Sequence, residues 1–267
     1  MICRTEGLVL KGYRMSESSR VVVLFTRDQG KLRLAARGAR RPKSKFGASL
    51  EAITWGSYVY YTQENRDLQT LSEGDIITPF GGLKKDYRKI VFASAVCDLL
   101  DHLTADNDEN ALLCSVTLDS LRWMESIQSA AIELPLWYFQ LKAASALGYR
   151  PHLSGCVQCG QRLSGNEVRF SPEHGGTVCG SCGYGGMVVK MNTVLYLESL
   201  QVNTPDRIDV EGFLRADRAE GQRILKRFLD YHIDSRKQVK ALDFLDRMLA
   251  AEGTPEPYQG SEQGVGT

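Results

Sequence analysis

The pattern of apolar and polar residues over positions 1–78 predicts short β-strands. Residues 21–25 form an apolar run rich in branched side chains, and residues 31–35 then alternate between polar and apolar. The intervening Asp28-Gln29-Gly30 is typical of a tight turn, so we expect these two strands to form a hairpin. Further strands are predicted at residues 7–10, 57–61 and 68–71. About five short strands favour a small barrel or sandwich, because closure of the sheet removes exposed strand edges.

The periodicity becomes helical after Pro79. Residues 85–148 are expected to form roughly three helices, with a loop at 106–110 and a helix end at Gly148. The apolar positions at helical spacing are Phe92, Val96, Leu99, Leu100, Leu103, Leu134, Trp137, Leu141 and Ala144.

Two more amphipathic helices are predicted around residues 224–232 and 242–249. The stretch 253–267 is composed mainly of Gly, Pro, Glu, Gln and Ser and has little to bury, which predicts a disordered tail. We therefore expect an α+β multidomain chain. Its predicted parts are a barrel at 1–79, a helical domain at 80–151, a cysteine module inserted at 152–190, helices at 191–252 that complete the helical domain, and the tail.

Two Cys-x-x-Cys pairs predict a metal site. Cys156 and Cys159 form the first pair, and Cys179 and Cys182 follow after a gap of 19 residues. Four thiolates at this spacing can surround one Zn²⁺ ion as a tetrahedron. Such a site has no open position for water, so we expect one structural ion rather than a catalytic one.

Several features of this module stay open at the level of sequence. The cysteines could instead be free or redox-active, and either His152 or His174 could replace one cysteine as a ligand. Gly160 and Gly183 follow the two pairs, and we expect both glycines to adopt the positive φ of a tight turn.

The overall charge conceals a strongly basic segment. The chain has 33 Lys and Arg against 32 Asp and Glu, and the net charge of +1 argues against binding to a polyanion. Residues 1–50, however, contain 12 basic and 3 acidic residues, a net of +9, which leaves −8 for the remainder. No acid occurs from Gln29 to Leu50. Seven cations within that segment are candidates for phosphate contacts, namely Lys31, Arg33, Arg37, Arg40, Arg41, Lys43 and Lys45.

Two other interpretations of this segment remain. It could be a solvated loop that only aids solubility, or a nuclear localisation signal, a pattern with many false positives. Phe46, Tyr58, Tyr60 and Tyr61 could stack on unpaired bases, but alternating tyrosines in a strand more often belong half to the core and half to the surface.

Other classes of protein are disfavoured. A hydrophobic content of 43% with 24% charged residues is typical of globular proteins. No apolar run approaches the ~18 residues of a membrane span. The remaining cysteines, Cys3, Cys97 and Cys114, are scattered, which fits a reducing cytoplasm.

No phosphate-binding, dinucleotide-binding or serine-nucleophile motif occurs, so we expect no enzyme. His102 and His232 fit core or interface positions better than catalytic ones. The acidic group Asp106, Asp108 and Glu109 could bind a metal ion but is more typical of a solvated turn.

The residues around the basic segment resemble the RecO family of bacterial DNA repair proteins. Leu24-Phe25-Thr26, Gly30-Lys31 and the stretch Ala36 to Ser44 carry the resemblance, which extends over about residues 4–250. It implies an N-terminal oligonucleotide-binding (OB) barrel, with the phosphate-contacting role on the seven cations and the metal-ligand role on the four cysteines. Some members of the family lack these cysteines, so the zinc prediction rests on this sequence.

The resemblance also implies a function and its partners. Such proteins bind single- and double-stranded DNA, anneal complementary strands, and act with RecR. They help load RecA onto strands coated by single-stranded DNA-binding protein, which places the chain in the cytoplasm at the nucleoid. On physical grounds alone, an RNA-binding or ribosome-associated module is an alternative. A zinc-dependent nucleic-acid enzyme is a weaker one, because the four-thiolate site offers no open position.

Overall fold

The computed structural model describes residues 1–63, 66–183, 185–215, 217–232 and 240–252. The predicted tail at 253–267 lies outside these residues. The chain forms two compact units. The first contains residues 1–150 and the start of the last helix, and the second contains residues 151–232 and the end of that helix.

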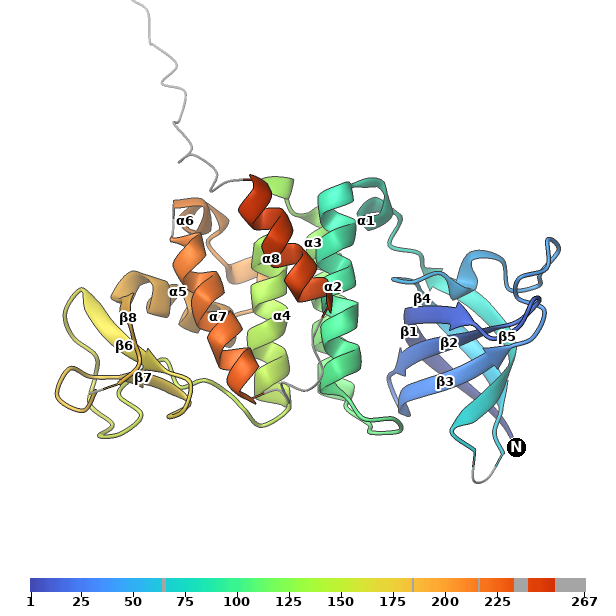
Figure 1. Ribbon diagram of the computed structural model, residues 1–267, viewed down its shortest axis with the longest axis horizontal. Coiled ribbons are helices and arrows are strands. Elements are labelled where there is room, and N and C mark those ends of the chain that lie inside the picture. The colour runs from blue at the N-terminus through green and yellow to red at the C-terminus, as the bar shows by residue number, and fades with distance from the viewer. Residues whose placement is uncertain (64–65, 184, 216, 233–239, 253–267) are drawn as a thin grey trace, which may run out of the picture. The chain divides into compact units, whose positions relative to one another are not determined.

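The first unit begins with the predicted five-stranded barrel (Figure 1). Its strands are β1 (Ile2–Arg14), β2 (Arg20–Thr26), β3 (Gly30–Ala36), β4 (Trp55–Tyr61) and β5 (Leu68–Thr78), and η1 (Gly47–Leu50) is a short 3-10 helix between β3 and β4. The strand order is β1-β2-β3-β5-β4, closed by pairing of β4 with β1, and only β3 and β5 run parallel. This is the Greek-key barrel of an OB fold, as the resemblance implied.

Side chains along each strand point alternately into and out of the barrel, and the inward-pointing ones are apolar and fill it. The buried cluster consists of Val9, Val22, Leu24, Leu32, Leu34, Ala36, Phe46, Leu50, Tyr58, Tyr60 and Leu71. Because side chains alternate between the two faces, this inward set fixes the register of β2 against β3. Three of the four aromatics considered for base stacking therefore belong to the core, and Tyr58 donates a hydrogen bond from its hydroxyl to the carbonyl oxygen of Ser49. Only Tyr61 of that set is exposed.

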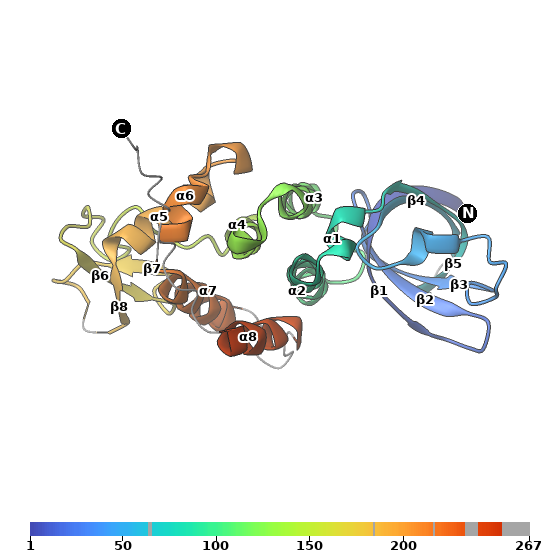
Figure 2. The same cartoon turned by 90° about the horizontal axis from the view of Figure 1, so that it is seen from above.

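The three predicted helices follow the barrel in the same unit. They are α2 (Tyr87–Leu103), α3 (Ala111–Ser126) and α4 (Glu133–Ala146), preceded by the short α1 (Gly81–Lys85) and interrupted by the 3-10 helix η2 (Ser129–Ala131). Figure 2 shows α2, α3 and α4 end-on and the barrel as a ring. The Asp86 carboxylate accepts hydrogen bonds from the first backbone N–H groups of α2, and Asn110 does the same for α3. After α4, Gly148 has φ +85°, which confirms the predicted helix end.

The second unit combines a small sheet with helices. The sheet order is β7-β6-β8, from β6 (Glu167–Ser171), β7 (Gly176–Val178) and β8 (Met187–Lys190). The helices are α5 (Met191–Val202), α6 (Val210–Arg215) and α7 (Arg218–His232), with the 3-10 helix η3 (Pro205–Arg207), and α8 (Lys240–Glu252) is shared between the units.

The sequence predicted helices over 191–252 but delimited only α7 and α8 within that range, and neither α5 nor α6. The apolar residues of α5 are spread around the helix, so its sequence shows no clear amphipathic stripe. The helices α5 to α7 belong to the same compact unit as the cysteines. The predicted division into domains stays a prediction. None of the described helices is long and apolar enough to cross a membrane.

The turn before β3 generates a prediction about stability. Gly30 has φ +61°, and a Cβ atom there would lie 2.1 Å from the backbone oxygen of Asp108. Gly47 has a similar φ of +50° but nothing within 4 Å of a Cβ. We expect Gly47→Ala to lower the free energy of unfolding by about 1 kcal/mol, the cost of the left-handed backbone. Gly30→Ala should cost about 2–4 kcal/mol, because the overlap adds to that cost. Urea denaturation measures both values, and equal losses would contradict the close approach to Asp108.

Candidate nucleic-acid interface and metal centre

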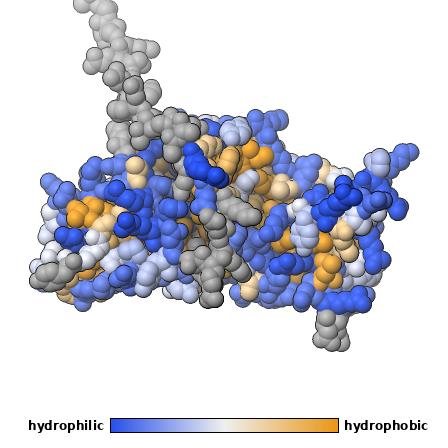
Figure 3. Space-filling view, viewed as in Figure 1, coloured by the Kyte–Doolittle hydropathy of each residue, from blue (hydrophilic) through white to orange (hydrophobic). Residues whose placement is uncertain are grey.

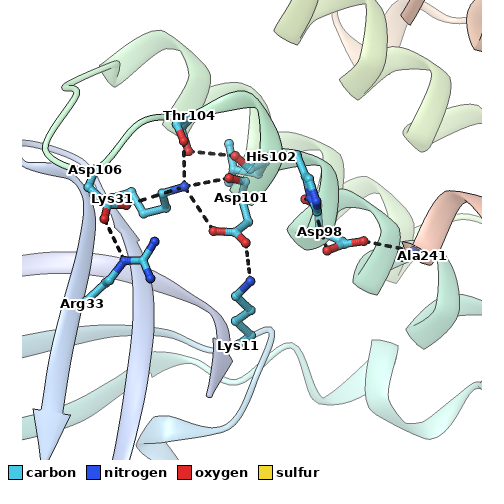
Figure 4. Close-up of polar contacts among 10 residues, drawn as sticks. Lys11, Lys31, Arg33, Asp98, Asp101, His102, Thr104, Asp106 and Ala241 are labelled. Atoms are coloured by element: carbon cyan, nitrogen blue, oxygen red, sulfur yellow. Dashed lines mark hydrogen bonds and ion pairs between the residues drawn. The ribbon is translucent and has the colours of Figure 1, made fainter. Parts of the chain in front are cut away.

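The seven predicted cations do not share one environment. Lys31 is buried at 5% exposure, on the outer face of β3. Its ammonium donates hydrogen bonds to the carbonyl oxygens of Asp101 and Thr104, both at 2.7 Å (Figure 4). The carboxylates of Asp101 and Asp106 lie 3.2 and 3.7 Å away. The phosphate-contacting role predicted for Lys31 does not fit this burial, and we leave it out of the interface.

The neighbouring charges complete a network between the barrel and the end of α2. The Arg33 Nε donates a hydrogen bond to Asp106 at 2.7 Å, and Lys11 pairs with Asp101. The pKa of Arg33 is raised, chiefly by this hydrogen bond, with a smaller contribution from Tyr13. Burial alone would raise the pKa of Asp101, but Lys11 and Lys31 outweigh that effect and lower it.

Two residues near this network have structural roles. Asp106, which the sequence suggested lies in a solvated turn, is instead bound to the cations of β3. His102 lies on α2 with its Nδ1 2.7 Å from the carbonyl oxygen of Asp98, which fits the structural role predicted for it. The Asp98 carboxylate also accepts a hydrogen bond from the backbone N–H of Ala241 at 2.9 Å, near the start of α8 (Figure 4).

The other cations lie on the loop between β3 and η1. Its five basic side chains are all exposed, and they are Arg37, Arg40, Arg41, Lys43 and Lys45. Figure 3 shows hydrophilic surface over this part of the barrel, at the upper right. Arg33 adds a guanidinium that is 41% exposed, although Asp106 already occupies its Nε.

Hydrogen bonds fasten this loop at several points. The Arg40 guanidinium donates to the carbonyl oxygens of Ser16 and Glu17, at 3.1 and 3.2 Å, and its backbone N–H donates to Ser18. At the far end, the Phe46 ring is buried in the barrel core. These hydrogen bonds hold the loop against the turn between β1 and β2, so its exposed cations are attached to an ordered backbone.

Two further cations belong to the same end of the barrel and were not predicted. The register pairs Arg14 with Arg20, and Arg20 with Ala36, which immediately precedes the loop. Thr26 pairs with Gly30 at the turn of the predicted hairpin. Six residues further from the turn on each strand, the same register places Arg20 opposite Ala36, so the sequence could have identified Arg20. The position of Arg14 depends on a register shift in β1 between Val9 and Lys11, which no sequence signal indicates.

The four predicted metal ligands come together in the second unit. The Sγ atoms of Cys156, Cys159, Cys179 and Cys182 lie within 4.8 Å of one another. The Sγ atoms of Cys159 and Cys179 are 3.8 Å apart. That separation fits a tetrahedron of sulfurs around a metal ion, since Zn–S bonds of about 2.3 Å give edges of about 3.8 Å. Burial alone would raise the pKa of Cys156, but backbone N–H groups that face its sulfur lower the pKa to about 6.

The surroundings of this cluster decide two of the open points of the sequence, the glycine conformations and the part played by the histidines. Gly160 has φ +71°, as predicted, but the prediction of positive φ was wrong for Gly183. A Cβ at Gly183 would instead lie 2.8 Å from the Arg169 side chain, so close packing explains the glycine. Neither His152 nor His174 joins the group, and the His174 Nδ1 lies 2.8 Å from the Ser171 hydroxyl.

Fold and site together define an OB-barrel protein with a helical region and a four-cysteine cluster able to hold a metal ion. Two family models match the chain: Recombination protein O N terminal over residues 1–80, and Recombination protein O C terminal over residues 84–241. The chain therefore belongs to the RecO family, whose members are non-enzymatic recombination mediators.

Curated proteins named DNA repair protein RecO are similar over most of their length. The protein of Symbiobacterium thermophilum is 30% identical over 257 residues, which is 92% of this chain and 97% of that protein. The protein of Caldanaerobacter subterraneus is 30% identical over 249 residues, covering 90% and 96%. That of Alkaliphilus metalliredigens is 28% identical over 240 residues, covering 88% and 95%.

The charge network predicts a pH-dependent contribution to stability. Because the pKa of Asp101 is lower in the folded chain, its contribution is complete above the unfolded pKa of about 4 and is lost as the pH falls through the folded value. Asp101→Asn should lower the free energy of unfolding by about 3 kcal/mol at pH 7, because two lysines lose their partner. The difference from the parent should shrink below about pH 4.

The control is Asp119→Asn. Asp119 is 43% exposed and pairs with Arg122 on the surface of α3, so its loss should cost less than about 1 kcal/mol. Urea denaturation between pH 3 and 7 measures both variants. A loss for Asp101→Asn that matches the control, or that does not change with pH, would disprove the role assigned to this carboxylate.

Proposed function

We propose that this chain binds single- and double-stranded DNA through the loop at 37–46 and the adjoining ends of β1 and β2. The observation that carries the proposal is a group of five exposed cations on a fastened loop, in a segment without acids from Gln29 to Leu50. Arginine forks match phosphate oxygens geometrically, and the loop backbone is already ordered by Arg40. Binding therefore requires little additional ordering of the protein.

We further propose that the chain anneals complementary strands. Two DNA strands repel each other through their phosphates, and a cationic surface that neutralises both lowers this repulsion. Base pairing then supplies the driving force, so the step needs no catalytic side chain. This mechanism agrees with the non-enzymatic character of the family.

Membership of the family supports a proposal about partners. We propose that the chain acts with RecR to help load RecA onto strands coated by single-stranded DNA-binding protein, in the cytoplasm at the nucleoid. The net charge of −8 outside residues 1–50 favours protein partners over DNA for the remaining surface.

We propose that the cysteine cluster holds one structural Zn²⁺ ion. Four thiolates with tetrahedral spacing match the ligand set of structural zinc, and they leave no position for a reacting water. When bound, the ion would join the turn at Cys156 to the turn at Cys179. Thr177 links the same segments by donating a hydrogen bond to the carbonyl oxygen of Gly155 at 2.7 Å.

The DNA-binding proposal is tested with the triple variant Arg37→Ala, Arg41→Ala and Lys43→Ala. Arg40 is left in place because it fastens the loop. About six phosphate contacts would give the parent protein a log–log salt slope near −4 for single strands, and losing three contacts should reduce its magnitude by about 2. Filter binding at several salt concentrations measures the slope, and a fluorescence assay measures the annealing rate, which should fall with it.

A matched control removes the same charge elsewhere. Lys85, Arg122 and Arg150 are exposed cations of the helical part of the first unit, and their joint replacement by alanine should leave annealing unchanged. If the two triple variants lose equal affinity, net charge alone explains binding. If neither loses affinity, or the parent anneals no strands, the proposal fails.

The zinc proposal predicts the metal content and the effect of its removal. Purified protein should contain about one zinc per chain by mass spectrometry of the metal, and the ion should stabilise its module by an amount on the order of 10 kcal/mol. A chelator should raise hydrogen exchange in residues 152–190 and leave the barrel protected. Cys159→Ser should lose the metal whereas Cys3→Ser should retain it, and protein purified without zinc would contradict the proposal.

A further inference from the structure

One exposed aromatic side chain lies within the cationic end of the barrel. Tyr13, near the end of β1, is 46% exposed. It pairs with Val21 of β2, and Val21 pairs with Ala35 of β3. The alternate residues Val22 and Leu34 point into the barrel core, so Tyr13, Val21 and Ala35 form a row on the outer face.

Two basic residues lie in the next row on the same face as this tyrosine. The next row along the outer face contains Lys11, Val23 and Arg33, and Tyr13 contributes to the raised pKa of the Arg33 guanidinium. Arg14 pairs with Arg20, and Arg20 pairs with the inward-facing Ala36, so these two arginines lie on the other face of the sheet from Tyr13. The exposed ring therefore lies one row from Arg33 on the outer face, in the row of Ala35, two residues before the first loop cation, Arg37.

This arrangement has the composition of a single-strand binding surface. Such surfaces follow the backbone with cations and stack unpaired bases on aromatic rings. The outer face of β2 and β3 is also where OB folds bind oligonucleotides. In a duplex the base faces are covered by their neighbours, so an isolated ring on the protein has nothing to stack on. Tyr13 can therefore act on single strands only.

We propose that Tyr13 stacks on an unpaired base and gives this end of the barrel its preference for single-stranded over double-stranded DNA. The inference rests on the proposed DNA-binding function. Tyr61 has the same exposed fraction of 46%, but its cross-strand neighbours are Ile2 and Thr70, and neither is charged. We therefore do not expect a DNA strand held by the loop cations to place a base on Tyr61.

The test measures the affinity of full-length variants for an oligothymidylate and for a duplex of the same length. Tyr13→Ala should raise the Kd for the single strand about 5-fold or more, which is the loss of one stacked base. The Kd for the duplex should stay within about 2-fold and the salt slope should not change, because no phosphate contact is removed. Tyr13→Phe should bind the single strand like the parent, since it keeps the ring.

Tyr61→Ala is the matched control and should behave like the parent. The inference is overturned if Tyr13→Ala binds the single strand normally, or weakens single-strand and duplex binding equally. It is also overturned if Tyr13→Phe is as weak as Tyr13→Ala, or if Tyr61→Ala shows the same loss. The triple loop variant separates the two proposals. If it binds both the single strand and the duplex as tightly as the parent, the result counts against DNA binding itself. Weak binding by that variant together with normal binding by Tyr13→Ala counts against stacking alone.

Discussion

The arrangement of the first unit depends on a buried ammonium group, that of Lys31. Removing this charge from water is costly unless its hydrogen bonds and its charge are both satisfied. Two carbonyl oxygens and two carboxylates provide that, and all come from the segment that ends α2 and follows it. The same segment continues as an isolated bridge between Asp106 and Lys31, in which Asn107 donates a backbone hydrogen bond to the Lys31 carbonyl. The contact between β3 and the end of α2 therefore depends on charge and hydrogen bonds.

This junction divides the outer face of β1, β2 and β3 into two ends. Near Gly30 the face is covered by residues 101–108, and its cations serve the fold. Towards the other end Tyr13 is exposed on this face, and the exposed cations of the loop follow Ala36 along the chain. Arg33 lies at the boundary, bound to Asp106 yet 41% exposed. A sequence with seven cations in fifteen residues thus has two different environments, one buried at the start of β3 and one exposed on the loop after it.

The same residues show which parts of the structure could be predicted from the sequence and which could not. Local patterns predicted what depends on near neighbours: the five strands, the turn at Gly30 and the two cysteine knuckles. Lys31 looked like Arg37 because the partners that bury it lie some 70 residues away, and no local pattern reveals them. The tyrosines of β4 were ambiguous for a related reason, since which of them faces inward depends on pairing with β1 and β5. Tyr13 was overlooked because β1 extends well beyond the predicted strand.

The position of the loop directly after β3 has a mechanical consequence. β3 is paired with β2 over its whole length and with β5 at residues 33–35, and Lys31 anchors its start. A pull on a polymer held by the loop is transmitted along the axis of this strand. The ladder bonds lie nearly perpendicular to that axis, so they share the load and resist it together. The cationic loop at 37–46 is thus attached to a strand that is paired on both sides.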